Sequence, residues 1–349
     1  MEQEKKLEWI IHPLLNWFEK EGRILPWRTE KNPYYIWLSE IMLQQTRIEA
    51  VKKYYDRFLE ELPTIKDLAE VKEEKLLKLW EGLGYYNRAR NLKKAAQIIV
   101  EQYAGAMPAS YEQLLKLPGI GEYTAGAIAS IAYHEKVPAV DGNVLRVISR
   151  ITGSKQDILL PITKKQVTNQ LKQIMPEEAG NFNEALMELG EIICLPNGEP
   201  LCTICPLKEN CIAKKENLTS QIPVREVKIK KRKEEKTIII LQCGKKVAIQ
   251  KRESKGLLAG MYQFLNIEGN LTKEEVIKYL IDNWNLKIEQ IEEIGEYTHI
   301  FSHVEWKMKG YQMKVKQENS KLLWVEQKEL EKQYPIPTAF QFFKKKIKI

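Results

Sequence analysis

The chain has 349 residues and a formal net charge of +8, a length that fits two domains better than one. It contains no run of the roughly 20 apolar residues that a membrane span needs, and its acidic start is unlike a signal peptide, so we expect a cytoplasmic protein without membrane contact. Residues 1–216 hold 29 basic and 30 acidic residues, 217–236 hold 7 and 3, and 237–349 hold 19 and 14. The basic surplus lies outside residues 1–216, and it permits nucleic-acid binding without arguing for it.

From residue 7 to about 190 the apolar residues recur with a helical period, and Gly, Pro and Asn separate the segments. Helices are predicted at 7–18, 36–46, 75–83, 91–103, 124–133, 144–151, 166–174 and 182–193. This part shows no strand-like alternation of any length. The pattern therefore predicts an all-α N-terminal domain over residues 1–216.

Composition changes at 217–236, which is charged and without core residues and is predicted to be a solvated interdomain linker. Strands are then predicted at 237–243, 245–252, 261–267, 303–315 and 322–327, with a helix near 273–284. The interleaving of strands and helices predicts a compact α+β domain over 237–349.

Two glycines, Gly119 and Gly121, stand in LPGIGEYTAG between the apolar ends of two predicted helices. A hairpin this tight needs residues without a Cβ where the backbone reverses. It leaves unpaired N–H groups at the start of the second helix, where they form an anion site. About twenty residues later a carboxylate, Asp141, stands in the turn PAVDGN before another helix. A phosphate-binding hairpin near a single aspartate suggests chemistry on a nucleic acid.

Four of the five cysteines cluster in the spacing C-x7-C-x2-C-x5-C, namely Cys194, Cys202, Cys205 and Cys211. Disulfides are not expected in a reducing cytosol. Four thiolates this close together can bind zinc or a [4Fe–4S] cluster, and the single C-x2-C pair disfavours a zinc ribbon. The fifth cysteine, Cys243, is predicted to be a buried strand residue.

The segments LPGIG, VDGN and WLSEIMLQQT, together with the cysteines after EALMELGEIIC, resemble the helix-hairpin-helix/Gly-Pro-Asp superfamily of DNA glycosylases, and within it the A/G-specific adenine DNA glycosylases of the MutY type. The resemblance implies a [4Fe–4S] cluster on the four cysteines, although the family normally has x6 where this chain has x7. It extends to KGLLAGMYQFLNI, which is similar to the Nudix-like C-terminal domain of these enzymes. The Nudix catalytic carboxylates are absent, so we expect binding there and no pyrophosphate hydrolysis.

The expected chemistry needs two carboxyl groups. Cleaving an N-glycosidic bond to a purine requires a proton donor for the leaving base and a stabiliser of the cationic sugar, as in glycoside hydrolysis. Glu40 lies between apolar residues in IWLSEIMLQQT, where burial is expected to raise its pKa. The resemblance implies that Glu40 is the acid, that Asp141 stabilises the sugar, and that Tyr123 and Asn143 contact the sugar.

Tyr123 also separates two reaction types. Endonuclease III-like enzymes, which cut the strand, carry a nucleophilic lysine four positions after the first hairpin glycine. This chain has Tyr123 there. The substitution favours a monofunctional glycosylase that releases the base and stops.

A base inside a duplex must be flipped out before it can react, and side chains fill the gap. The resemblance assigns this role to residues of the QQT and GYY motifs, here Gln45, Thr46 and Tyr85. It indicates an adenine pocket formed by Trp27, Arg28 and Glu184. In the C-terminal domain, Phe301, Ser302 and His303 match the F-[S/T]-H hairpin that reads 8-oxoguanine opposite the target.

The hypothesis is a monomeric, nucleoid-associated base excision repair enzyme that removes adenine mispaired with 8-oxoguanine or guanine in double-stranded DNA. Two alternatives remain open: an endonuclease III-like glycosylase/AP lyase for oxidised pyrimidines, and a non-catalytic lesion-binding protein. An electron-carrying iron–sulfur protein would explain only the cysteines.

Overall fold

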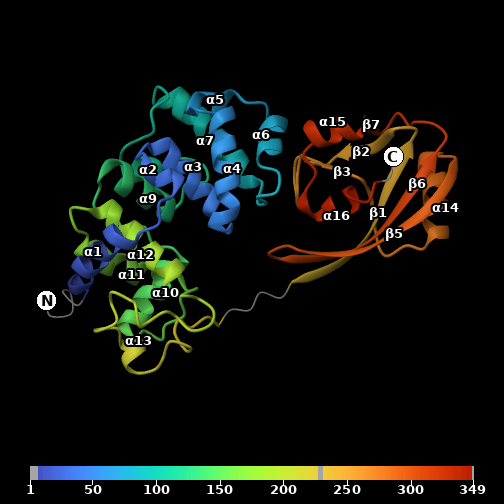
Figure 1. Ribbon diagram of the computed structural model, residues 1–349. Coiled ribbons are helices and arrows are strands. Elements are labelled where there is room, and N and C mark those ends of the chain that lie inside the picture. The colour runs from blue at the N-terminus through green and yellow to red at the C-terminus, as the bar shows by residue number, and fades with distance from the viewer. Residues whose placement is uncertain (1–6, 227–230, 348–349) are drawn as a thin grey trace. The chain divides into compact units, whose positions relative to one another are not determined.

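The computed structural model describes residues 7–226 and 231–347, and its α-carbon contacts divide the chain into two compact units. The first unit comprises residues 1–70 and 90–227, and the second comprises 71–89 and 228–349 (Figure 1). Within the described residues, no helix has the length and apolar character needed to span a membrane. The predicted fold class, a mainly α unit followed by an α+β unit, is confirmed.

The first unit is helical, as predicted. Its helices are η1(Glu8–Ile10), α1(Ile11–Glu21), α2(Pro26–Thr29), α3(Pro33–Leu43), α4(Ile48–Glu61), α5(Ile65–Glu70), most of α7(Asn87–Gln102), α8(Tyr111–Leu114), α9(Glu122–Tyr133), α10(Gly142–Thr152), α11(Pro161–Ile174), α12(Ala179–Ile192) and α13(Ile212–Lys215). The prediction omitted α4, although its buried Ile48, Val51, Tyr55 and Phe58 follow a helical period.

Helices α3, α9 and α12 form the centre of this unit. Helix α9 packs against α3 and α12, and α12 also packs against α1 and α10. Residues of α3 and α9 are buried on nearly all sides, which is why these helices are apolar around most of their circumference. A polar side chain on α3 is therefore held away from water unless it faces a cavity.

The second unit contains α6(Glu73–Leu79) and a mixed sheet of β1(Arg232–Cys243), β2(Lys246–Lys251), β3(Tyr262–Gln263), β4(Leu265–Glu268), β5(Ile288–Ile300), β6(Val304–Val315) and β7(Leu323–Glu326). The main strand order is β3-β2-β1-β6-β5, with β1 and β6 parallel and β5 antiparallel to β6. The prediction omitted β5 because its charged residues at an exposed edge lack a clear apolar alternation.

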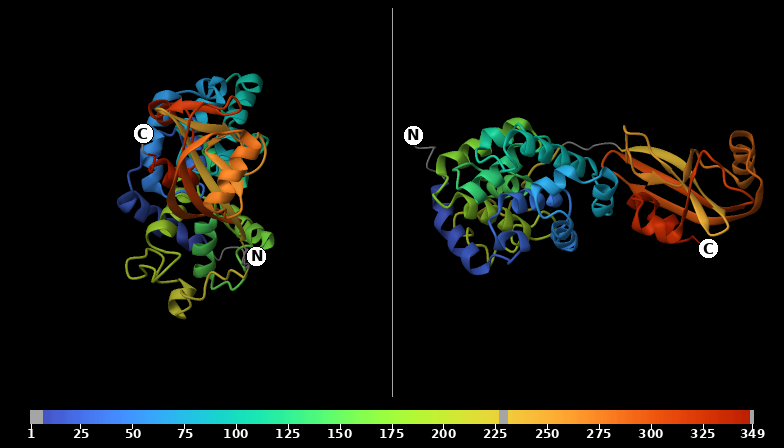
Figure 2. Two further views of the ribbon diagram at one scale, coloured as in Figure 1. Left: turned by 90° about the vertical axis from the view of Figure 1, so that its right-hand side faces the viewer. Right: turned by 90° about the horizontal axis from the view of Figure 1, so that it is seen from above.

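Helices cover both faces of this sheet, as Figures 1 and 2 show. On one face α14(Lys273–Trp284) packs over Ile239 and Leu241 of β1. On the other, α15(Gln327–Lys332), η2(Thr338–Phe340) and α16(Gln341–Lys344) pack over Ile238 and Ile240. Burial on both faces explains why 238–241 is a continuous apolar run.

The predicted linker at 217–236 requires correction at both ends. At its start, Arg150 of α10 donates to the carbonyls of Thr219 (3.0 Å) and Ile222 (2.8 Å), and Ile158 N donates to Val224 O (3.1 Å), so this stretch belongs to the first unit. At its end, residues from Arg232 onward belong to β1 and pair with β6. The first residues of this strand are exposed, so their charged side chains are compatible with the sheet. Residues 227–230 lie outside the described residues.

Segment 71–89, which the sequence placed in the N-terminal domain, groups with the second unit. There Glu81 Oε1 accepts hydrogen bonds from Ile336 N and Gln341 Nε2, both at 3.1 Å. These contacts join residues more than 250 positions apart, which no local sequence pattern reveals.

Candidate functional site

A cavity of about 630 Å³ opens in the first unit, between α2, α3, α9, α12 and the start of α10. It brings together nine predicted site residues: Trp27, Arg28, Glu40, Gln45, Thr46, Tyr123, Asp141, Asn143 and Glu184. These residues span more than 150 positions of sequence, and the helical packing places them around one space.

Glu40 lies on α3, and only 6% of its surface is exposed. Burial raises the pKa of Glu40 to about 7, and the nearby carboxyls of Asp141 and Glu184 also raise it, while Tyr123 and Arg28 act in the opposite direction. Its Oε2 atom is buried without a hydrogen-bond partner, which costs folding free energy and is uncommon in folded proteins. A carboxyl that keeps its proton near neutral pH and faces a cavity is suited to donate that proton.

Asp141 is the N-cap of α10. Its Oδ1 accepts from Val144 N at 2.8 Å, and its Oδ2 accepts from Asn143 Nδ2 at 2.9 Å. Burial raises the pKa of Asp141, while these two N–H donors favour its charged form. The positive end of the α10 dipole adds to the donors. The carboxylate is thus held in one orientation, facing the same cavity as Glu40.

The turn before Asp141 is fixed by a buried amide that the sequence analysis did not identify. Asn183 of α12 accepts from Ala139 N (3.0 Å) and donates to Val137 O (2.9 Å) and Ser130 Oγ (2.9 Å). Because the peptide groups of the turn cannot reach water, their bonds to Asn183 set where α10 begins.

Asn143 connects Asp141 to the cysteine loop. Its Oδ1 accepts from Arg146 Nη2 (2.9 Å), and Arg146 also donates to Gly190 O (2.6 Å) and, through Nε, to Cys194 O (2.8 Å). A Cβ at Gly190 would lie 2.7 Å from Asn143 Cβ, so α12 approaches Asn143 this closely because the residue is glycine.

Arg28 and Glu184 form the wall predicted to receive the base. Arg28 Nε donates to Glu184 Oε1 at 3.0 Å, and burial raises the pKa of Glu184 while Arg28 and Lys31 lower it. Trp27 is buried with its ring edge-on to Tyr55, the ring centroids 5.3 Å apart. Trp27 gives this wall an apolar surface, and Arg28 and Glu184 give it a pair of charged groups.

Tyr123 occupies the position where a lysine would act as nucleophile in a lyase. It lies on α9, and its hydroxyl donates to Met187 Sδ at 3.0 Å. Burial raises the pKa of Tyr123 well above its usual value, and the Glu40 and Asp141 carboxyls raise it further. The phenol is therefore neutral and acts here as a hydrogen-bond donor.

The glycine hairpin precedes α9. Gly119 has a φ of +78°, and a Cβ there would lie 2.7 Å from Asn91 Cβ, so its position demands glycine on two grounds. Gly121 is the N-cap of α9 and has open space around it, with no side-chain oxygen capping the helix. No side chain caps the first N–H groups of α9, and Gly121 is exposed, so this helix start suits an anion.

Four predicted DNA-contacting residues belong to the second unit. Phe301, Ser302 and His303 form the turn between β5 and β6, with Phe301 N donating to Val304 O at 2.8 Å. The Phe301 ring packs edge-on against Trp306 at 4.9 Å, and the Ser302 hydroxyl lies 3.2 Å from His303 Nδ1. Tyr85, also in this unit, is 45% exposed and has a φ of 47°.

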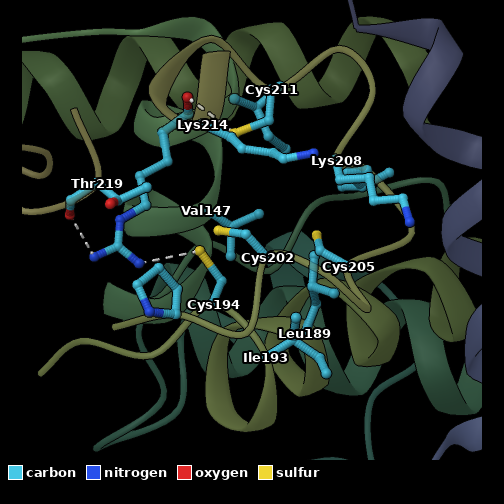
Figure 3. Close-up of a pocket in the computed structure, with 14 residues that line it drawn as sticks. Val147, Leu189, Ile193, Cys194, Cys202, Cys205, Lys208, Cys211, Lys214 and Thr219 are labelled. Atoms are coloured by element: carbon cyan, nitrogen blue, oxygen red, sulfur yellow. Dashed lines mark hydrogen bonds between the residues drawn. The ribbon is translucent and has the colours of Figure 1, made fainter. Parts of the chain in front are cut away.

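The four clustered cysteines surround one small cavity of about 30 Å³, as Figure 3 shows. They come from the end of α12 and the loop before α13. Arg150 Nη1 donates to Cys194 Sγ at 3.3 Å, and the backbone N–H groups of Leu207 and Lys214 face Cys205 and Cys211. Burial raises the pKa of the Cys202, Cys205 and Cys211 thiols, and the amide donors at Cys205 and Cys211 offset only part of that rise.

No group of three or more His, Cys, Asp or Glu side chains among the described residues is arranged to hold a single metal ion. Zinc needs four ligands about 2.0–2.3 Å from one point, whereas in a [4Fe–4S] cluster the four thiolates bind different irons. Four cysteines spread around a cavity, with N–H donors directed at the sulfurs, fit the cluster.

Comparison with known proteins agrees with both units. Residues 38–177 match the family model of the HhH-GPD superfamily base excision DNA repair proteins, and residues 237–346 match the NUDIX domain model. An adenine DNA glycosylase of Buchnera aphidicola subsp. Acyrthosiphon pisum is 36% identical, over 83% of this chain and 82% of that protein. One of Arabidopsis thaliana is 35% identical, over 87% of this chain and 57% of that longer protein.

Solved structures resemble the first unit. A thermostable thymine-DNA glycosylase superposes with a TM-score of 0.56 at 29% identity, covering 62% of this chain and all of that one. An endonuclease III trapped as a covalent intermediate with DNA has a TM-score of 0.52 at 25% identity, over 62% of this chain and 98% of that one.

Proposed function

The chain belongs to the adenine DNA glycosylase family of base excision repair enzymes, and on this basis we propose that it excises adenine mispaired with 8-oxoguanine or guanine and leaves the DNA strand intact. It acts as a nucleoid-associated monomer, since one chain carries both the catalytic cavity and the mispair-reading hairpin. The observation on which this proposal rests is the buried Glu40 carboxyl, whose Oε2 has no hydrogen-bond partner and which lines the same cavity as the Asp141 carboxylate.

The reaction begins with adenine in the cavity, flipped out of the duplex. Trp27 packs on the base, and the Arg28–Glu184 pair bonds its polar edge. Glu40 transfers its proton to adenine N7, and the C1′–N9 bond breaks with its electron pair going to the base. The Asp141 carboxylate stabilises the positive charge left on the sugar.

Water completes the reaction. Its oxygen bonds to C1′, and one of its protons returns to the ionised Glu40, so the acid is regenerated and an abasic site remains. Tyr123 and Asn143 contact the sugar. Because Tyr123 has no amine, no Schiff base forms and the strand is not cut.

DNA contacts outside the cavity have three parts. The outward N–H groups after Gly119 and Gly121 bind a phosphate. Gln45, Thr46 and Tyr85 fill the gap left by the flipped nucleotide. Phe301 supports the hairpin from which Ser302 and His303 bond the edge of 8-oxoguanine.

Cys194, Cys202, Cys205 and Cys211 would hold a [4Fe–4S] cluster. Such a cluster supplies a rigid crosslink of its loop, and no step of base release passes through it. Arg146 joins the loop to Asn143 by hydrogen bonds, so an ordered loop supports the orientation of Asp141.

A cleavage assay tests the proposal. Purified protein in excess is incubated with end-labelled duplexes that hold adenine opposite 8-oxoguanine, guanine or thymine, and each sample is analysed with and without hot alkali. Strand breaks that require alkali, and that arise opposite 8-oxoguanine or guanine, are expected. Breaks without alkali, together with a borohydride-trapped adduct, would instead indicate a lyase. Absence of breaks in all samples would contradict an adenine glycosylase.

A further inference from the structure

Arg28 and Glu184 of the cavity wall belong to a row of five side chains of alternating charge. They are, in order of contact, Glu184, Arg28, Glu188, Arg23 and Glu191. Each neighbouring pair is joined by an ion pair of 2.6–3.0 Å. The three glutamates lie on α12, whereas the two arginines lie on α2 and on the segment just before it.

Glu188 is the centre of this row, and its side chain is fully buried. It accepts hydrogen bonds from Arg23 N (3.2 Å), Nε (2.6 Å) and Nη2 (3.0 Å), and from Arg28 Nη2 (3.0 Å). Burial alone would raise the pKa of Glu188, but the two guanidinium groups bring it below its usual value. Glu188 is therefore an anion held between two cations.

Arg28 also acts on Glu40, because its positive charge lowers the pKa of that carboxyl. The groups that act on the pKa of Glu40 are Tyr123 of α9, Asp141 at the start of α10, Glu184 of α12 and Arg28 of α2. Arg47, Glu188 and Glu191 line the same cavity, and Arg28 is the cation that lowers the pKa of Glu40. A guanidinium that moved toward Glu40 would remove its proton, and a Glu40 anion cannot protonate a base.

Arg28 is held in place by its ion pairs with Glu184 and Glu188, by its bond to Arg23 O (3.1 Å) and by the Phe18 ring, 5.1 Å away. We propose that Glu188 is a positioning residue that anchors the Arg28 guanidinium beside Glu184 and so leaves the proton on Glu40. This inference rests on the proposed function, because it concerns the proton that adenine receives.

The test is the pH profile of single-turnover adenine excision, measured with Glu188→Gln, Glu188→Asp, Arg28→Met and unaltered protein. The rate of the unaltered protein is expected to fall at alkaline pH as Glu40 loses its proton. In Glu188→Gln, Arg28 loses one of its two ion pairs and can shift toward Glu40, so the alkaline limb moves to lower pH by about one unit. Arg28→Met removes the cation, so its limb moves to higher pH.

Glu188→Asp separates position from charge. It keeps the anion but shortens the side chain by one methylene, which weakens its contacts with both arginines. The alkaline limb of the Glu188→Asp profile is expected to move to lower pH, as in Glu188→Gln, but by about half a unit. Glu177→Gln, which removes an exposed partner of Lys136 away from the cavity, is the matched control and should leave the profile unchanged.

The outcomes are distinguishable. A shift in Glu188→Gln with none in Glu188→Asp would mean that Glu188 acts through its charge alone, and superimposable profiles of all Glu188 variants would also overturn the inference. If Glu188→Gln does not fold, the Glu188→Asp profile decides by itself. If the unaltered protein excises no adenine, the proposed function fails instead.

Discussion

The cavity of the first unit and the hairpin tip of the second carry the two main sets of site residues, and they are built in opposite ways. In the cavity, Glu40 and Asp141 are enclosed, and their surroundings shift their pKa values. At the tip, Ser302 and His303 are exposed, and only Phe301 is packed. A group that must keep an unusual protonation state needs burial. A group that reads a base edge needs a free donor or acceptor.

The largest effect is expected from removing the proton donor. Glu40→Gln keeps the size of the side chain but supplies no acidic proton, so single-turnover excision should fall by at least about a hundredfold. Affinity for the mispaired duplex, measured by gel shift, should be retained. Glu101→Gln, at an exposed position of α7, is the control. Loss of affinity in Glu40→Gln would show that Glu40 is structural.

The same burial predicts a pH dependence. The folded-state pKa of Glu40 is about 7, above its ordinary value, so the protonated form dominates below that pH and is lost above it. Excision should fall about tenfold per pH unit above neutrality. The stability contributed by this group is full below the unfolded-state pKa and is lost as pH rises through about 7. A rate that stays flat between about pH 6 and 9 would contradict the raised pKa.

Arg146 bonds both Asn143, at the larger cavity, and Cys194, at the cysteine cavity. Its substitution tests whether the enclosed site depends on the cysteine loop. Arg146→Met leaves the carbonyls of Gly190 and Cys194 and the Asn143 side chain without their donor. We expect a loss of about 2–3 kcal/mol in the free energy of unfolding, measured by urea denaturation, and about tenfold slower excision. Lys165→Met, on the surface of α11, is the control. Unchanged excision in a destabilised Arg146→Met protein would separate the loop from catalysis.

The smallest effect is expected at the exposed tip. Ser302→Ala removes one solvent-facing hydroxyl, so the preference for 8-oxoguanine over guanine should fall by about fivefold, the value of one neutral hydrogen bond. The melting temperature should not change. Equilibrium binding to the two duplexes measures the ratio, and Ser320→Ala, in an exposed loop, is the matched control. An equal loss of affinity for both duplexes would contradict base reading.

The sequence identified residues that line the cavity more readily than the residues that hold them in place. Short motifs at helix starts and on buried helices mark Glu40, Asp141, Tyr123 and Asn143 in the sequence, and the packing of α3, α9 and α12 brings them around one cavity. Glu188 was not identified, although its spacing of four from Glu184 places both on one face of α12. Asn183 gave no signal, because its role comes from bonds to residues over 40 positions away.

In the second unit the apolar strands were predicted and the charged edge strand β5 was not. The linker was predicted too long because charge was taken as a sign of irregular structure. Charge at an exposed strand end, as in Arg232 and Glu234, is equally compatible with a sheet.

Helix α12 connects the cavity of the first unit to the cysteine loop. It carries Glu184 and Glu188, which line the cavity of the first unit. Cys194 follows its end by two residues, and Cys194 N donates to Leu189 O at 2.7 Å. Packed helices change between discrete positions and do not deform smoothly. Damage to the cysteine loop is therefore expected to divide a preparation into working and idle molecules. The amplitude of a product burst would count the working ones, while the rate of the burst would stay that of an intact enzyme.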